Sequence, residues 1–267
     1  MKATIKESRD KNIPLFSKYY IYKILNFFLI LFFSLFSPKW LLRSALQKTQ
    51  IKYLNLGGYR STEDYLNIQL SPVELYGIPT TQYTTVSLHY DEVQGIIEQQ
   101  VRKLTFPVIS LHYNILKGLP LDSDSLLGIN MSHILEHFTR EEGLKVLKDC
   151  HRVLVPGGVL RISCPDLLVY AKAYIARDSG FYNSTAIRMA CCYEHLNTYG
   201  DKFISKAYDN ENGHKWFYDA ESAIFLLKTA GFLKVEERQL HDSSLPNIEN
   251  IEPEHRQAES FYIEAIK

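Results

Sequence analysis

The stretch from Lys117 to Leu167 constrains the fold of this 267-residue chain more than any other. An apolar run ends there in a polar cluster at 132–137, an amphipathic pattern follows, and Pro-Gly-Gly at 156–158 leads into a second apolar run, Val159–Ser163. Parallel strands joined by a helix form a βαβ unit, from which doubly wound sheets are built. Ligands of such sheets bind beyond the carboxyl ends of the strands. The pattern therefore predicts a site at 132–137.

The helix between these two strands begins with a recognisable cap. Thr139 is a favourable N-cap, and Glu142 three residues later completes a capping box. Its apolar face is predicted to consist of Leu144, Val146, Leu147, Cys150, Val153 and Leu154. Further along, Asp219 is the expected N-cap of a second helix, which Gly231 ends. Residues 92–101 are read as a helix, and 246–256 as a loop between the last two strands.

Several motifs in this order resemble the class I S-adenosylmethionine-dependent methyltransferases, and the methyltransferase type 11 group in particular. The matching segments are Gly118–Leu121, Ser132–His137, Arg152–Gly158, Ser163–Asp166, Gly213–Asp219, Ala230–Phe232 and Ser260–Lys267. The resemblance covers roughly residues 51–267. It implies an α/β fold with a Rossmann-like, doubly wound sheet of about seven strands. It also implies transfer of a methyl group from S-adenosylmethionine to a small-molecule or glycan-linked acceptor.

The glycine-rich segment after the first expected strand departs from the family pattern. Gly57 and Gly58 are present, but Tyr59 replaces the second family glycine, and Gln69 replaces the acidic residue that binds the ribose. The resemblance implies that Gly57 and Gly58 frame the cofactor. It further places Gln69 at the ribose, and Asn114 and Ser132 beside the cofactor. A neutral hydrogen bond is about half as strong as a charge-assisted one. The alternative is therefore a non-catalytic scaffold at a membrane that has lost cofactor binding.

Two histidines are candidate catalytic residues. His133 directly follows the expected strand end, and His214 belongs to an aromatic cluster that could line an acceptor pocket. The run His133-x-x-Glu136-His137 is also a zinc-peptidase pattern, which requires the ligands on one face of a helix. Because a strand precedes the run and the capped helix follows it, no metal is expected. Glu136 and His137 are expected to brace the loop.

The net charge and the cysteine content indicate which ligands and which cellular compartment to expect. The formal net charge is +0, so the sequence provides no basic field for nucleic acid. The four cysteines are Cys150, Cys164, Cys191 and Cys192, which contain no CxxC pair. A reduced, cytoplasmic setting is therefore predicted.

The N-terminal extension, residues 1–44, differs from the domain predicted at 45–267. Residues 24–38 are uncharged and aromatic-rich, and basic residues flank them on both sides. As a helix this run would measure about 22 Å, whereas the hydrocarbon core of a bilayer is about 30 Å thick. The composition favours membrane association through residues 19–42, by a tilted or an embedded helix. A buried or dimer-forming helix is the alternative.

Overall fold

The computed structural model describes residues 51–57, 62, 64–69, 84–91, 96–103, 110–112, 114–184, 186–187, 196–208 and 214–267. The predicted N-terminal anchor at 19–42 lies outside the described residues, as do Gly58 and Tyr59. Within the described part of the chain, no helix has the length and apolarity that crossing a bilayer requires.

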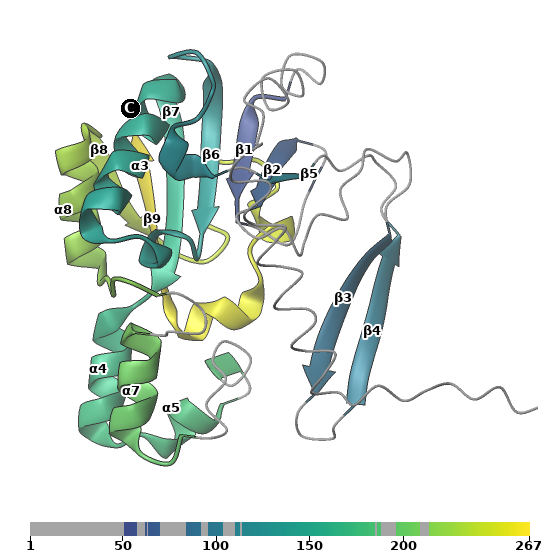
Figure 1. Ribbon diagram of the computed structural model, residues 1–267, viewed down its shortest axis with the longest axis vertical. Helices are drawn as coiled ribbons and strands as arrows, with labels where there is room; N and C mark the ends of the chain where they lie inside the picture. Colours follow the sequence, from purple (N-terminus) through teal and green to yellow (C-terminus); the bar gives the residue numbers. More distant parts are fainter. Residues whose placement is uncertain are drawn as a thin grey trace, which may run out of the picture.

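The fold is a mixed α/β sheet with helices packed against it (Figure 1). The strands are β1 Tyr53–Leu56, β2 Tyr65–Gln69, β3 Thr84–Asp91, β4 Ile96–Lys103, β5 Ser110–His112, β6 Leu126–Ser132, β7 Leu154–Pro165, β8 Lys234–Arg238 and β9 Ser260–Ile266. The α-helices are α3 Arg140–Val153, α4 Leu167–Ala176, α5 Ser179–Asn183, α7 Tyr199–Ala207 and α8 Ala220–Ala230. Short 3₁₀ helices are η2 Ile115–Lys117, η3 Leu135–His137, η4 Ile248–Asn250 and η5 Glu254–Ala258.

Seven of these strands form the main sheet, in the order β5-β2-β1-β6-β7-β9-β8. The five strands from β5 to β7 pair in parallel, and β9 pairs antiparallel with both β7 and β8. The chain runs outward from β1 to β2 and β5 on one side, and later to β6 and β7 on the other. The point between β1 and β6 is therefore a topological switch point. The predicted α/β sheet is confirmed, and its strand order is consistent with a Rossmann-like fold.

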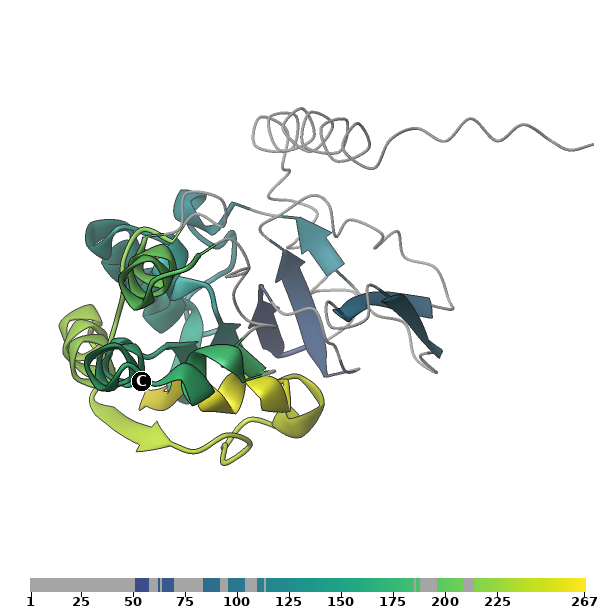
Figure 2. The ribbon, with the colours of Figure 1, turned by 90° about the horizontal axis from the view of Figure 1, so that it is seen from below.

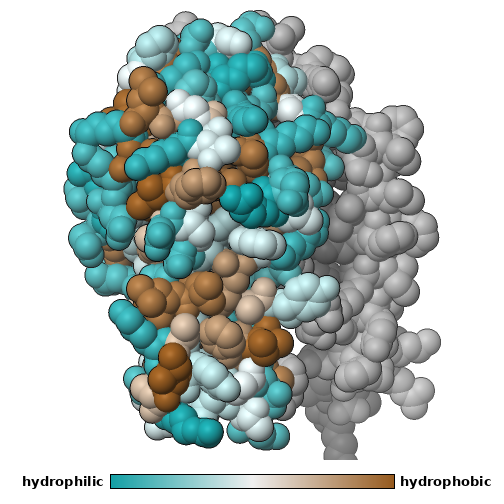
Figure 3. Space-filling model, turned by 90° about the vertical axis from the view of Figure 1, so that its left-hand side faces the viewer, coloured by the Kyte–Doolittle hydropathy of each residue, from teal (hydrophilic) through white to brown (hydrophobic). Residues whose placement is uncertain are grey.

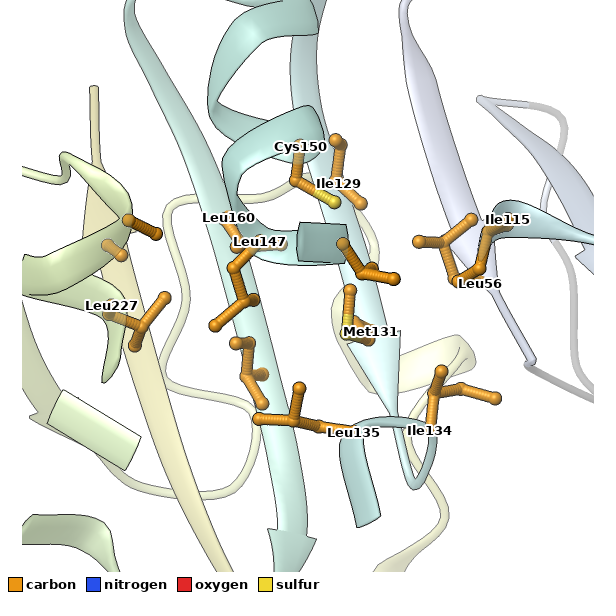
Figure 4. Packing of buried hydrophobic residues seen from close by; sticks show 14 of the residues in the cluster. Leu56, Ile115, Ile129, Met131, Ile134, Leu135, Leu147, Cys150, Leu160 and Leu227 are labelled. Atoms are coloured by element: carbon orange, nitrogen blue, oxygen red, sulfur yellow. The ribbon is translucent and has the colours of Figure 1, made fainter. Parts of the chain in front are cut away.

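Helices α3 and α8 cover one face of the sheet with an apolar core. Leu147 and Cys150 of α3 pack toward the strand residues Ile129, Met131 and Leu160 (Figure 4). The predicted capping box is present, because Thr139 Oγ1 accepts from the Glu142 amide at 3.2 Å and Glu142 Oε2 accepts from the Thr139 amide at 2.9 Å. Local capping and an apolar stripe thus place α3 where the sequence predicts it.

Helix α8 also begins and ends at the predicted residues. The Asp219 side chain accepts from the Ser222 amide at 2.8 Å, and Gly231 ends the helix in a left-handed conformation with φ 113°. The helix predicted at 92–101 is wrong from residue 96 onward. There the chain forms β4, which pairs antiparallel with β3 as a separate two-stranded sheet.

The opposite face of the main sheet carries a row of polar side chains that share one register position. The row runs Asn67, Asn55, Asn130, Arg161, Glu264 and Glu236 across neighbouring strands. Asn55 Nδ2 donates to Asn67 Oδ1, and Asn130 Nδ2 donates to Asn55 Oδ1, each at 2.9 Å. The side chains of this row from Asn67 to Glu264 are buried. Their polar atoms must therefore form hydrogen bonds with one another or with the chain segment that covers this face.

Arg161 ties the segment between β8 and β9 to this face. Its guanidinium donates to both carboxylate oxygens of Glu252 at 2.8 Å, and to the backbone oxygens of Asp242 at 2.7 Å and Gln239 at 3.0 Å. Beside it, Leu245 packs over Gly128, where an added Cβ would lie 2.4 Å from a Leu245 methyl. The predicted loop at 246–256 is thus a tightly bound cover that includes η4 and part of η5.

A helical lobe of α4, α5 and α7 lies beyond the carboxyl ends of β6 and β7 (Figure 1). Figure 2 views the molecule from the side of this lobe. Its small core consists of Tyr170, Ala173, Tyr182 and Ile187. Hydrophobic side chains also gather on its outer surface and over α8 (Figure 3), where the exposed ones include Leu168, Ile175, Ile204 and Phe225.

We expect Glu252→Ala to lower the free energy of unfolding by roughly 3–5 kcal/mol, because it leaves the Arg161 charge buried without its bidentate partner. Chemical denaturation followed by circular dichroism measures the change. Glu236→Ala is the control, since Glu236 is 41% exposed and solvent screens its pair with Lys234, so its unfolding should stay close to that of the wild type. Equal losses in the two variants would contradict the assignment of Arg161 as the anchor.

Candidate functional site

The carboxyl ends of β1 and β6 meet at the topological switch point, and both carry predicted site residues. Gly57 follows β1, and its amide donates to the Ile68 carbonyl at 2.8 Å. Its φ of +72° is in the left-handed region, and an added Cβ would lie 2.0 Å from Ile134 Cδ1. Two features therefore favour glycine at position 57: the left-handed backbone conformation and the close approach of the Ile134 side chain.

The other predicted cofactor residues lie along the same edge. Gln69 is the last residue of β2, and Ser132 is the last residue of β6. Ser132 Oγ accepts from Ser163 Oγ at 2.9 Å. Asn114 follows β5 and caps η2, because its Oδ1 accepts from the Leu116 amide at 3.0 Å. The fold thus aligns Gly57, Gln69, Asn114 and Ser132 on one edge, with Gly58 outside the described residues.

His133 adopts a strained backbone conformation directly after β6. Its φ is +53°, which is uncommon for a residue with a side chain, and its amide donates to the Ser163 carbonyl at 2.8 Å. The ring lies between two polar partners: Nε2 is 3.0 Å from Ser260 Oγ, and Nδ1 is 3.3 Å from Glu136 Oε1. Ile134, rather than His133, is the side chain that lies against Gly57.

Glu136, which the sequence predicted to brace the loop, lies at the centre of a cluster with His133, His137 and His214. Its side chain is 1% exposed, and neither carboxylate oxygen has a well-aligned hydrogen-bond donor among the described residues. Burial alone would raise its pKa, but the neighbouring His133, followed by His137 and His214, holds the pKa below its usual value. Glu136 is therefore an anionic carboxylate in the interior.

His214 reaches this cluster from a distant part of the sequence. The amides of Lys215 and Trp216 donate to the Glu136 carbonyl at 2.8 and 3.2 Å, which fixes the segment beside η3. The His214 and His137 rings meet edge to face, with centroids 4.9 Å apart. Burial lowers the pKa values of both His133 and His214, more than the carboxylate of Glu136 raises them. The neutral imidazole is therefore favoured in both.

A second buried carboxylate, Glu259, joins the helical lobe to the sheet. It accepts from the Tyr170 hydroxyl at 2.6 Å, pairs with Lys206 Nζ at 2.9 Å and also contacts Arg256. Burial opposes its charge, but Lys206 and then Arg256 hold its pKa well below the ordinary value. Glu259 was not predicted as a site residue, because Tyr170 and Lys206 lie far from it along the chain. Glu136 was predicted only to brace the loop.

The stability contribution of Glu259 should depend on pH with a definite sign. A carboxyl whose folded pKa is depressed contributes its stabilisation above the unfolded pKa of about 4.3, and loses it as pH falls further. We expect Glu259→Gln to cost roughly 3 kcal/mol at neutral pH, with the gap to wild type narrowing below about pH 4.3. Denaturant unfolding between neutral and acid pH measures this gap.

Glu249→Gln is the matched control, because Glu249 is exposed on η4. Its free energy of unfolding should track that of the wild type at every pH. A gap for Glu259→Gln that stays constant through the acid range would show that the Glu259 carboxylate is not held by its cationic partners.

The chain was compared with protein families, curated proteins and solved structures. No family model matches the chain, and no curated protein matches it. The structure is similar to an S-adenosylmethionine-dependent methyltransferase from Archaeoglobus fulgidus, with a TM-score of 0.42 and 15% identity over 89% of this chain and 98% of that one. It is also similar to one from Mesorhizobium loti, with a TM-score of 0.41 and 15% identity over 85% and 95% of the two chains.

A third similar structure is an S-adenosylmethionine-dependent methyltransferase from Thermotoga maritima, described as a possible histamine N-methyltransferase. It has a TM-score of 0.40 and 17% identity over 94% of this chain and 96% of that one. With TM-scores below 0.5, these likenesses carry no further weight for the activity of the chain.

Proposed function

We propose that the chain transfers a methyl group from S-adenosylmethionine to a small-molecule or glycan-linked acceptor. The observation that carries the proposal is Gly57, in a left-handed turn at the switch point between β1 and β6. Open α/β sheets bind ligands at that point, and a glycine allows a close approach of backbone and ligand. The motif order from Gly118 to Lys267 supports this chemistry over others.

The residues along this edge suit the cofactor through neutral contacts. Gln69 would hydrogen-bond the ribose hydroxyls, and Gly57 with Gly58 would leave room for the cofactor. Asn114 Oδ1 already accepts from the Leu116 amide, so its Nδ2 is the group that would donate to an adenine nitrogen. Ser132 lies at the end of β6, on the same edge. We propose that these neutral groups hold the cofactor without a carboxylate.

S-adenosylmethionine would supply an electrophilic methyl group on a sulfonium sulfur. The protein then has to position an acceptor and remove its proton. His133 is the proposed base, because burial lowers its pKa and Glu136 orients its ring from the Nδ1 side. Nε2, which contacts Ser260 Oγ at 3.0 Å, is the nitrogen that would accept the proton. His214, on the other side of Glu136, would help to line the acceptor pocket.

Calorimetric titration with S-adenosylmethionine and S-adenosylhomocysteine tests the proposal. We expect one binding site in the wild type, and roughly fivefold weaker binding in Gln69→Ala, since one neutral hydrogen bond contributes about 1 kcal/mol. Gln69→Asp should tighten binding roughly fivefold, because the hydrogen bond to the ribose becomes charge-assisted. Asn250→Ala, which removes an exposed amide on η4, should bind like wild type.

The same titration separates His133 from the cofactor residues. His133→Ala should keep wild-type affinity for S-adenosylhomocysteine, because a base acts on the acceptor rather than on the cofactor. An absence of binding in the wild type and in Gln69→Asp would refute methyl transfer and favour the non-catalytic scaffold.

Membrane association through residues 19–42 is the second part of the proposal. It is supported by the uncharged, aromatic-rich run with basic flanks. Deleting residues 1–44 should move the protein from the membrane fraction to the supernatant without changing its circular dichroism beyond the loss of the deleted segment. Full-length protein that stays in the supernatant without detergent would contradict the anchor.

A further inference from the structure

Glu136, His137 and His214 bring three potential metal ligands together. One ligand atom from each residue lies within 4.8 Å of the others. Two of the residues belong to η3 and its surroundings, whereas His214 comes from the segment before α8. The amides of Lys215 and Trp216 hold that segment to the Glu136 carbonyl, so the backbone itself fixes the three side chains near one another.

The buried carboxylate of Glu136 is not neutralised by the hydrogen bonds around it. It is 1% exposed, and both of its oxygens lack a well-aligned donor among the described residues. His133 Nδ1 stands 3.3 Å from Oε1, on one side of the carboxylate. Buried carboxylates are normally hydrogen-bonded, paired or bound to a metal. Oε2 has no well-aligned donor among the described residues and is therefore available as a ligand atom.

The His214 imidazole is arranged as a metal-binding histidine usually is. Its Nδ1 lies 2.9 Å from the backbone oxygen of Lys206. A carbonyl oxygen can only accept, so Nδ1 carries the proton and Nε2 keeps its lone pair. A backbone carbonyl that fixes the tautomer of a histidine in this way is a common outer-sphere partner of zinc ligands. The His137 ring contacts the His214 ring edge to face.

We propose that Glu136, His137 and His214 bind a divalent transition-metal ion of the zinc class. Two imidazoles and one carboxylate leave a fourth position open, which is the composition of catalytic rather than structural zinc sites. Tetrahedral ligands at about 2.1 Å from zinc are roughly 3.4 Å apart, so binding draws these side chains together by up to about 1.4 Å. His133 then supports Glu136 from outside the coordination sphere.

Binding of the ion is independent of the proposed methyl transfer, whereas its role in the reaction rests on that proposal. An open position on the metal would take an acceptor oxygen or water and lower the pKa of its proton. The site lies directly after β6, beside the proposed base His133. The substrate class that fits is a hydroxyl-bearing acceptor able to coordinate the metal through oxygen.

The experiment uses the full chain, stripped with a chelator and titrated with ZnCl₂ in a calorimeter, with CoCl₂ as the spectroscopic probe. We expect about one equivalent of zinc per chain and the visible absorption of tetrahedral cobalt. His137→Ala and His214→Ala should each weaken zinc binding at least tenfold and abolish the cobalt spectrum. Glu136→Gln, which keeps the shape of the side chain, should do the same.

His151→Ala is the matched control, because His151 is a partly buried histidine at the end of α3 that packs on Phe232 away from the cluster. It should bind zinc like wild type, and circular dichroism should show that all variants are folded. Failure of the wild type to bind zinc or cobalt would overturn the proposal. So would undiminished binding in the His137→Ala/His214→Ala double variant, since the ion would then lie elsewhere.

Failure of this proposal can be told from failure of the proposed function. Titration of the chelator-treated protein with S-adenosylhomocysteine reports on the cofactor edge alone. Zinc binding without cofactor binding would keep the metal site and remove methyl transfer, whereas cofactor binding without zinc would do the reverse.

Discussion

The buried guanidinium of Arg161 is the interaction on which most of the sheet depends. A charge at the centre of a sheet is tolerated only when every donor finds an acceptor, and Arg161 finds them in Glu252 and in two backbone oxygens of the segment between β8 and β9. That segment therefore lies flat on the sheet. The adjoining asparagine row and Gly128, with Leu245 packed over it, fit the same cover.

The two faces of the sheet therefore differ in polarity, and the edge formed by the carboxyl ends of its parallel strands is polar. Helices α3 and α8 bury an apolar core on one face, whereas the other is held by a charged anchor and a row of amides. At the carboxyl edge two more acids are buried. Glu259 is neutralised by cations and a hydroxyl, whereas Glu136 has histidines near it but no well-aligned hydrogen bond from any residue that the structure describes. This contrast between two similarly buried acids distinguishes an anchor from a candidate ligand.

The elements that sequence analysis predicted are those whose signals are local. The cap of α3 depends on residues three apart, Thr139 and Glu142, and α8 begins and ends at Asp219 and Gly231. The residues that the resemblance implied for the cofactor lie at the ends of β1, β2 and β6. Arg161 was read only as part of an apolar strand, because its partner Glu252 is 91 residues away and no local rule pairs them.

The metal-ligand cluster shows a related limit. The run His133-x-x-Glu136-His137 was tested against a helix that would place its ends on one face, and the chain forms only the short η3 there. The ligand set that the fold offers instead combines Glu136 and His137 with His214, which no spacing rule connects. The local pattern thus contains two of the three proposed ligands, whereas only the fold adds the third.

The turn at His133 links the cofactor edge to this cluster. Its positive φ sends two successive side chains in different directions: the His133 ring lies against Ser260 and Glu136, and Ile134 lies over Gly57. A side chain at position 57 would have to displace the side chain of Ile134, the residue that follows His133 in this turn. The turn therefore joins the proposed cofactor edge to the polar cluster, because its two successive side chains contact one each.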